Sequence, residues 1–283
     1  MNGNTQKKSL RADPFSLVMR VLVWGAALLT AGVLLALIAY ILIRGVPNLK
    51  LSLFELEYNS KNVSMFPSIV MTIYMTVLTL IITTPLGIGC AIYLTEYAKR
   101  GNKVVEVIRL AAETLSGIPS IVYGLFGMLF FVTALQWKNS ILAGSCTLAI
   151  MVLPLIIRST EEALKSVPDS YREASFGLGA GKLRTVVRVV LPPAMPGIVA
   201  GVILAVGRIV GETAALIYTA GTVAKITANP MESARTLAVH MYALSSEGLH
   251  TSEAFATGVV LLLVVLMLNA TSNAIAKRIT KGK

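Results

Sequence analysis

The sequence predicts an all-α, polytopic membrane protein with six transmembrane helices. Its 283 residues are 55% hydrophobic and only 14% charged, whereas a soluble globular domain carries about 25% charged residues. The apolar residues fall in long blocks without charge, as expected of membrane spans rather than of one large core. The Lys and Arg residues behind the net charge of +11 lie between these blocks. That distribution is typical of membrane topology and not of a nucleic-acid-binding face.

Six apolar blocks are long enough to cross a membrane, because a helix rises about 1.5 Å per residue and the hydrocarbon core is about 30 Å thick. The blocks are residues 21–43, 67–95, 114–135, 140–157, 196–224 and 254–276. The first is too long for the apolar core of a cleaved signal peptide, and no small-residue cleavage site follows it. We therefore expect it to be a retained helix.

The distribution of Lys and Arg predicts that both termini are cytoplasmic. With this orientation eighteen basic residues lie on the inner side, six lie on the outer side, and Arg208 lies within a span, which agrees with the positive-inside rule. The inner residues are Lys7, Lys8, Arg11, Arg20, Lys99, Arg100, Lys103, Arg109, Arg158, Lys165, Arg172, Lys182, Arg184, Arg188, Lys277, Arg278, Lys281 and Lys283. The outer residues are Arg44, Lys50, Lys61, Lys138, Lys225 and Arg235.

The longest inner segment, residues 158–195, is predicted to contain short helices at the membrane surface. Ser159 with Glu162, and Ser170 with Glu173, each have the spacing of a capping box, so a helix is expected to begin at each pair. The second of these helices is expected to span 171–178 and to end at Gly179, since glycine tolerates the left-handed conformation found at helix ends. The alternative is a plain solvated connector.

A third short helix is predicted after residue 181 in the same segment. Its apolar residues, Leu183, Val186, Val187, Val190 and Leu191, follow the i, i+3, i+4 pattern of one helix face. The two prolines that come next, at positions 192 and 193, are expected to end it.

The most unusual feature within a predicted span is the run Gly207-Arg208-Ile209-Val210-Gly211-Glu212. An arginine at bilayer depth costs about 2.5–3.5 kcal/mol and therefore indicates a transport pathway or a partner. Glu212 lies four residues on, where it can neutralise Arg208 on the same helix face. The two glycines let a ligand or another helix approach, and the guanidinium fork suits a tetrahedral oxyanion. The alternative is a purely structural ion pair.

Other candidate residues allow two interpretations each. Arg158 at the inner end of the fourth block is either a topological anchor or part of an anion path. Gly117-Ile118-Pro119-Ser120 is expected to break or kink the third span, and broken helices line transporter cavities but also occur in packed bundles. Cys90 and Cys146 lie in apolar segments and are expected to remain unpaired.

The sequence has no pattern typical of catalysis, of a cofactor or of a metal site. The two histidines, His240 and His250, lie in an outer loop without metal-site spacing and are expected to be solvated. The glycine-rich run 177–182 superficially resembles a phosphate loop, but Phe176 stands at the first glycine position and Leu183 follows the lysine where Ser or Thr is required. We therefore expect no nucleotide site in this chain.

The inner segment resembles the EAA signature of permease subunits from bacterial binding-protein-dependent ABC importers. The matching residues, at the spacing of the signature, are Glu173, Ala174, Ser175, Gly179, Val189, Leu191 and Pro192, with Ser175 and Val189 as mild departures. The resemblance implies a type I ABC importer permease architecture. It also implies that the short helix from Tyr171 to Leu178, before Gly179, is a coupling helix that docks on a separate ATPase subunit.

Shorter runs resemble the PstA-type permease subunit of phosphate-specific ABC importers. These runs are residues 117–127, 153–168, 205–214 and 234–242. The resemblance implies phosphate as cargo and assigns Arg208, Glu212 and Arg158 to phosphate movement. It implies a PstC-type second permease, two PstB-type ATP-binding subunits and a PstS-type extracytoplasmic binding protein as partners, besides membrane lipid.

With this resemblance the chain divides into four parts. Residues 1–20 form a cytoplasmic segment, 21–43 the first helix, 66–276 the permease domain with its coupling loop 158–195, and 277–283 a cytoplasmic tail. Two rival functions are a permease for another oxyanion, such as molybdate or sulfate, and a secondary transporter or channel that uses Arg208 and Glu212 as a proton-coupled pair. The EAA-type segment argues against the secondary transporter, which has no ATPase to dock.

Overall fold

Helices and their connections make up all of the chain that the computed structural model describes, residues 14–99 and 101–281, with no strand among them. This confirms the all-α prediction. Several basic residues used in the topology argument lie outside the described residues, namely Lys7, Lys8, Arg11, Arg100 and Lys283, as does most of the predicted segment 1–20.

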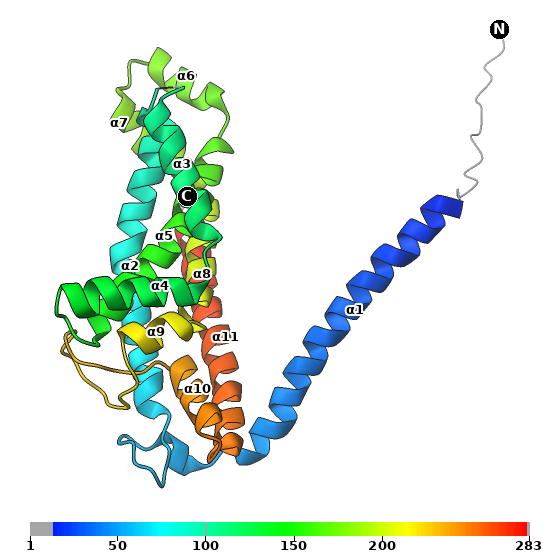
Figure 1. Cartoon of the computed structure of the whole chain (residues 1–283). Helices are drawn as coiled ribbons and strands as arrows, with labels where there is room; N and C mark the ends of the chain where they lie inside the picture. The colour runs from blue at the N-terminus through cyan, green and yellow to red at the C-terminus, as the bar shows by residue number, and fades with distance from the viewer. Residues whose placement is uncertain (1–13, 100, 282–283) are drawn as a thin grey trace.

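The first helix, α1 (Pro14–Gly45), diverges from the rest of the molecule (Figure 1). The C-terminal end of α1 meets the start of the last helix, α11 (Thr251–Lys281), where the ring of Tyr40 packs edge-on against that of Phe255 with 5.6 Å between ring centroids. Most of its apolar side chains are exposed within the single chain. Two short 3₁₀ turns, η1 (Val46–Asn48) and η2 (Leu51–Phe54), then lead to the second long helix.

The centre of the bundle is α5 (Ile141–Lys165), which packs against α2 (Phe66–Ile92) and α8 (Leu191–Val210). α2 continues into a π-helical turn, η3 (Tyr93–Tyr97). One apolar cluster lies at mid-bundle around Met75, Leu148 and Ile209, and a second lies towards the end that carries the short helix α6 (Asp169–Gly177), around Leu94, Leu164 and Val190. α5 is largely buried by its neighbours, whereas α2 and α8 also expose apolar side chains such as Ile81 and Leu204, as expected of helices that face lipid.

Within residues 14–99 and 101–281, five helical stretches are long and apolar enough to cross a membrane, and a bent pair makes a sixth crossing if it counts as one span. The pair consists of α3 (Lys103–Ser116) and a second part formed by α4 (Ser120–Gly127) with the π-helical η4 (Met128–Ala134). The two parts meet at 105°. This confirms the predicted break at 117–120, where Pro119 cannot continue α3; the predicted block 114–135 therefore contains the end of α3 and the whole of the second part.

The fourth and fifth spans differ from their predicted bounds. α5 runs on to Lys165, so the capping box at Ser159 and Glu162 is wrong. Ser159 lies inside the helix, and its hydroxyl donates to the carbonyl of Ile156 at 3.2 Å. Its side chain packs against Gly201 of α8, where a Cβ would collide with it. The fifth helix ends at Val210 and does not reach residue 224.

The two prolines at 192 and 193 do not end the preceding helix, contrary to the prediction. α7 (Lys182–Thr185), the π-helical η5 (Val186–Val190) and α8 form one continuous helical stretch. Pro192 is the second residue of α8, where an N–H is not needed, and the wider π turn before it accommodates the ring. Of the predicted apolar face, Val186 and Val190 are buried while Leu183 and Val187 are exposed.

Two short helices lie across or at the ends of the bundle (Figure 1). α9 (Ala214–Thr219) lies across it beside α4. α10 (Leu237–Glu247) lies at the end opposite α6 (Asp169–Gly177).

His240 in α10 is fully buried, so the expectation of a solvated histidine is wrong. Its ring meets Tyr58 edge-on at 6.1 Å, and neither ring nitrogen has a hydrogen-bond partner of good geometry within the described residues. Burial, together with the nearby positive charge of Arg235, lowers the pKa of His240 to about 3, although the backbone of Val63 has an opposing influence.

Candidate functional site

Arg208 lies in the last turn of α8 and lines a pocket of about 430 Å³. The other walls come from α3 and α5, which cross beside the end of α8. The charged residues around the pocket are Arg109, Glu113, Arg158, Glu161, Glu162, Lys165 and Arg208. Two of the predicted pathway residues, Arg208 and Arg158, are thus brought to one pocket from segments fifty positions apart.

Two carboxylates form ion pairs with three of the four cations in this pocket. Oε1 of Glu161 lies 2.5 Å from a guanidinium nitrogen of Arg109 and 2.7 Å from the ammonium of Lys165. These are ion-pair distances, although the angles at this oxygen are not those of hydrogen bonds. Arg158 donates to Glu162 at 3.0 Å, and both side chains are exposed. An exposed pair of this kind contributes only about 0–1 kcal/mol.

Arg208 is different because no carboxylate of residues 14–99 or 101–281 lies within ion-pair distance of its guanidinium. The side of α8 next to it is open: a Cβ placed on Gly207 would meet no atom within 4 Å. The half-buried guanidinium therefore faces space in which an anion or another subunit can be accommodated.

Glu212 does not pair with Arg208, and this prediction is wrong. The four-residue spacing puts two side chains on one face only while the helix continues, and α8 ends at Val210. Glu212 is 9% exposed, and its Oε1 accepts a hydrogen bond from the backbone N–H of Ala215 at 3.1 Å, at the start of α9. The carboxylate thus stabilises the turn from α8 to α9.

The sequence reasoning missed Arg109, Glu161 and Lys165 as pocket residues and used only the charges of Arg109 and Lys165, for topology. A signal was present in α3, where Glu106, Arg109 and Glu113 follow i, i+3, i+7 on one polar face while Val104, Val107 and Leu110 are exposed on another. Pairing with α5 could not be found this way, because Glu161 is distant in sequence from Arg109.

A second pocket of about 640 Å³ adjoins the first and shares Arg109 and Lys165 with it. It extends to the end of the bundle that carries α6, where Glu96, Arg172 and Lys182 line it. Basic side chains therefore line both pockets, the first at Arg208 and the second at the end of the molecule that carries α6.

The predicted surface helix 171–178 is confirmed as α6, which spans Asp169–Gly177. Gly179 has φ +81°, the left-handed conformation expected of it. The capping box is wrong here too, because Ser170 lies within the helix and Pro168 precedes it without a side-chain cap. Proline before the first turn presets the entry of the chain.

The EAA-type residues divide between an exposed face and a packed face. Tyr171, Glu173 and Ala174 are exposed, as are Phe176 and Leu178, the last to 89%. Ser175 is buried, and its hydroxyl lies 2.8 Å from that of Thr185 in α7, which holds the two helices together. Leu191 and Pro192 begin α8 and are half-buried. An exposed apolar face on a short surface helix is typical of a docking site for another protein.

Known structures resemble the fold over almost its whole length. One is the "Crystal structure of bacterial alginate ABC transporter in complex with alginate pentasaccharide-bound periplasmic protein", in which a chain matches 95% of this chain and 98% of its own length, with a TM-score of 0.69 and 16% sequence identity. At that identity the likeness concerns the fold.

Sequence relatives are closer. The "Probable ABC transporter permease protein YqgI" of Bacillus subtilis is 36% identical over 273 residues, which are 90% of this chain and 92% of that protein. The "Phosphate transport system permease protein PstA 2" of Mycobacterium bovis is 35% identical over 208 residues, 72% of this chain and 68% of that protein. Residues 83–282 match the family described as "Binding-protein-dependent transport system inner membrane component". The chain therefore belongs to this family of multi-pass inner membrane components of binding-protein-dependent transport systems.

Proposed function

We propose that this chain is a permease subunit of an ATP-driven importer that carries inorganic phosphate across the cytoplasmic membrane. The family membership supports the transport role, and the relative named as a phosphate permease supports the cargo. The observation that carries the proposal is the half-buried Arg208, which lines a pocket of about 430 Å³ and has no carboxylate partner among the described residues.

Arg208 is proposed to bind the phosphate through two oxygens. A guanidinium presents a planar fork that matches the spacing of two oxyanion oxygens, and it stays charged at any physiological pH. Holding such a cation within an apolar span is costly unless an anion visits it. Glu212 positions the turn after α8 and thereby Arg208, instead of neutralising it.

Arg158 is proposed as a second anion contact nearer the end that carries α6. Its pair with Glu162 is exposed and weak, so a phosphate can replace the carboxylate at little cost. Arg109 and Lys165 are held by Glu161 and keep the wall between the two pockets in place. The pathway therefore uses the unpaired cation first and the weakly paired one next.

Energy for transport is proposed to enter through α6, since the chain is expected to have no nucleotide site of its own. The exposed side chains of Tyr171, Phe176 and Leu178 would fit a groove on an ATP-binding subunit. In this proposal both termini are cytoplasmic, and the partners are a PstC-type permease, two PstB-type ATPases and a PstS-type binding protein. ATP binding would draw the coupling helices together and open the pathway to the outside, and hydrolysis would reset it.

The test is phosphate uptake by the whole complex in lipid vesicles, with the binding protein and with ATP supplied on the side of the ATPases. Arg208→Gln should lower uptake at least tenfold while the complex still assembles, and Arg208→Lys should also impair it because an ammonium lacks the fork. Arg20→Gln, which removes an exposed arginine from α1, is the matched control.

Three results would contradict the proposal. Near-normal uptake by assembled Arg208→Gln would remove Arg208 from the pathway. Uptake that proceeds without ATP would favour a secondary transporter. Stronger competition by unlabelled sulfate or molybdate than by unlabelled phosphate would assign the permease to another oxyanion.

A further inference from the structure

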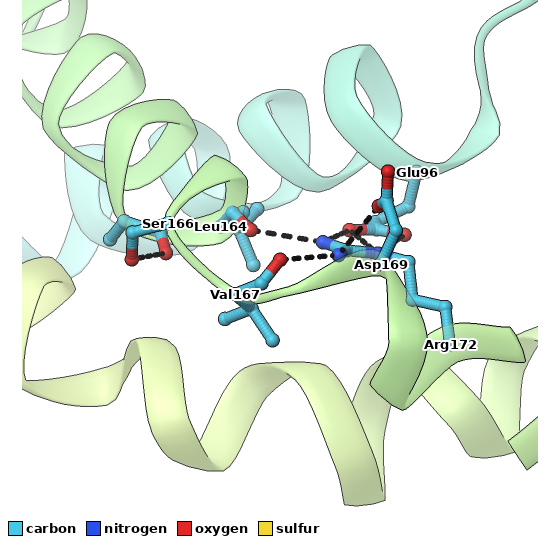
Figure 2. A network of polar contacts seen from close by, with 7 residues as sticks. Glu96, Leu164, Ser166, Val167, Asp169 and Arg172 are labelled. Carbon is cyan, nitrogen blue, oxygen red and sulfur yellow. Dashed lines mark hydrogen bonds and ion pairs between the residues drawn. The ribbon is translucent and has the colours of Figure 1, made fainter. Parts of the chain in front are cut away.

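Arg172 of α6 connects three parts of the molecule through one guanidinium group (Figure 2). Its Nε lies 3.2 Å from both carboxylate oxygens of Glu96 in η3, and its Nη2 donates to Glu96 Oε1 at 2.7 Å. Nη2 also donates to the carbonyl of Leu164 at 2.9 Å, and Nη1 donates to the carbonyl of Val167 at 2.8 Å and to Asp169 at 3.1 Å. All the N–H donors of the guanidinium are thereby used.

The contacts differ in how firmly they hold. The side chains of Arg172 and Glu96 are 14% and 8% exposed, whereas that of Asp169 is 71% exposed. A charged pair shielded from water interacts more strongly and is screened less by salt than an exposed one. The hydrogen bonds and the negative charge of Glu96 raise the pKa of Arg172 above its ordinary value. The pair with Glu96 is therefore the firm contact.

The carbonyl groups complete the connection. Leu164 belongs to the last turn of α5, where carbonyl groups have no partner within the helix and a cation is favourable. Glu161 and Lys165, which line the pocket at Arg208, belong to the same stretch of α5. A displacement of the Arg172 head group therefore displaces the part of α5 that forms the pocket wall.

We infer that Arg172 and Glu96 form a strut that makes α6 move as one body with the inner end of the second span and with α5, so that a force applied to α6 reaches the pocket at Arg208. The inference rests on the proposed coupling role of α6. Arg172 is a positioning residue in this account, since it contacts neither the anion nor the ATPase. Without the strut, α6 remains folded and exposed but moves independently of the spans.

The measurement is the number of phosphate ions imported per ATP hydrolysed by the assembled complex in vesicles. This ratio is independent of how much complex is recovered, so a loss of stability alone does not change it. Because a single substitution would strand a buried charge, the main variant is the double Glu96→Gln/Arg172→Gln. The matched control is Lys225→Gln/Glu232→Gln, which removes an exposed ion pair of 2.6 Å at a distance from α6.

The double variant should bind the ATPase and hydrolyse ATP, but its ratio should fall at least fivefold, while the control pair keeps the parent ratio. Arg172→Lys, which retains the charge but cannot reach three elements at once, should give an intermediate ratio. If the double variant does not assemble, the test rests on Arg172→Lys, and a lowered ratio of phosphate imported to ATP hydrolysed in that variant supports the strut. A parent-like ratio in whichever of the two assembles overturns it. Absence of phosphate import by the parent complex would instead contradict the proposed function itself.

Discussion

Replacing Glu212 with glutamine distinguishes a cap on α9 from an ion-pair partner of Arg208. In the structure the carboxylate accepts one hydrogen bond from the N–H of Ala215 and has no cation within ion-pair distance among the described residues. A glutamine oxygen can accept the same hydrogen bond. We therefore expect Glu212→Gln to retain assembly and most of the phosphate uptake.

The magnitudes separate the two accounts. A hydrogen bond to a charged acceptor contributes about 1.5–3 kcal/mol and a neutral one about 0.5–1.5 kcal/mol, so the glutamine variant should lose about 1 kcal/mol. Glu212→Ala leaves the Ala215 N–H buried without a partner, which costs about 1–3 kcal/mol. If Glu212 instead neutralised Arg208, either substitution would strand a charge at a cost of about 3–5 kcal/mol.

The assay compares thermal unfolding midpoints of the purified complex in detergent, together with uptake in vesicles, for the parent, Glu212→Gln and Glu212→Ala. The expected order of stability is parent, then glutamine, then alanine, with uptake following the same order. Equal and large destabilisation by both substitutions would refute the capping account, since it would show that the negative charge itself is required.

Three further predictions follow from other parts of the molecule. Gly179→Val should reduce co-purification of the ATPase but not membrane insertion, because a β-branched residue at φ +81° costs at least about 1–2 kcal/mol. The control is Gly177→Ala, at a helical position with open space around it. Normal ATPase recovery with Gly179→Val would contradict the role of α6. In a chain freed of its own cysteines, an impermeant thiol reagent should label a cysteine at position 138 but not at 182 in intact cells, and the reverse pattern would overturn the topology. Because burial lowers the pKa of His240 to about 3 from 6.5, the folded state binds fewer protons than the unfolded state, so stability is retained above about pH 6.5 and is lost as the pH falls towards 3, by about 2 kcal/mol at pH 5. His240→Phe should flatten the fall of the unfolding midpoint between pH 7 and 5, and an unchanged slope would contradict a neutral buried imidazole.

Local patterns in the sequence determined several features of this protein. Long apolar blocks predict helical spans because a backbone in hydrocarbon must satisfy its own hydrogen bonds. Gly117 and Pro119 predict the break between α3 and α4, and Gly179 predicts the end of α6, because the conformations that these residues permit depend on the backbone itself.

The tertiary structure decided where the long helices end and which charges meet. Ser159 and Glu162 have the spacing of a cap, yet α5 continues through them because Gly201 lets α8 pack closely there. Arg208 and Glu212 have the spacing of an ion pair, yet α8 ends between them and Glu212 binds the next helix. Spacing specifies neighbours only while a helix continues, and whether it continues depends on packing between segments that are distant in the sequence.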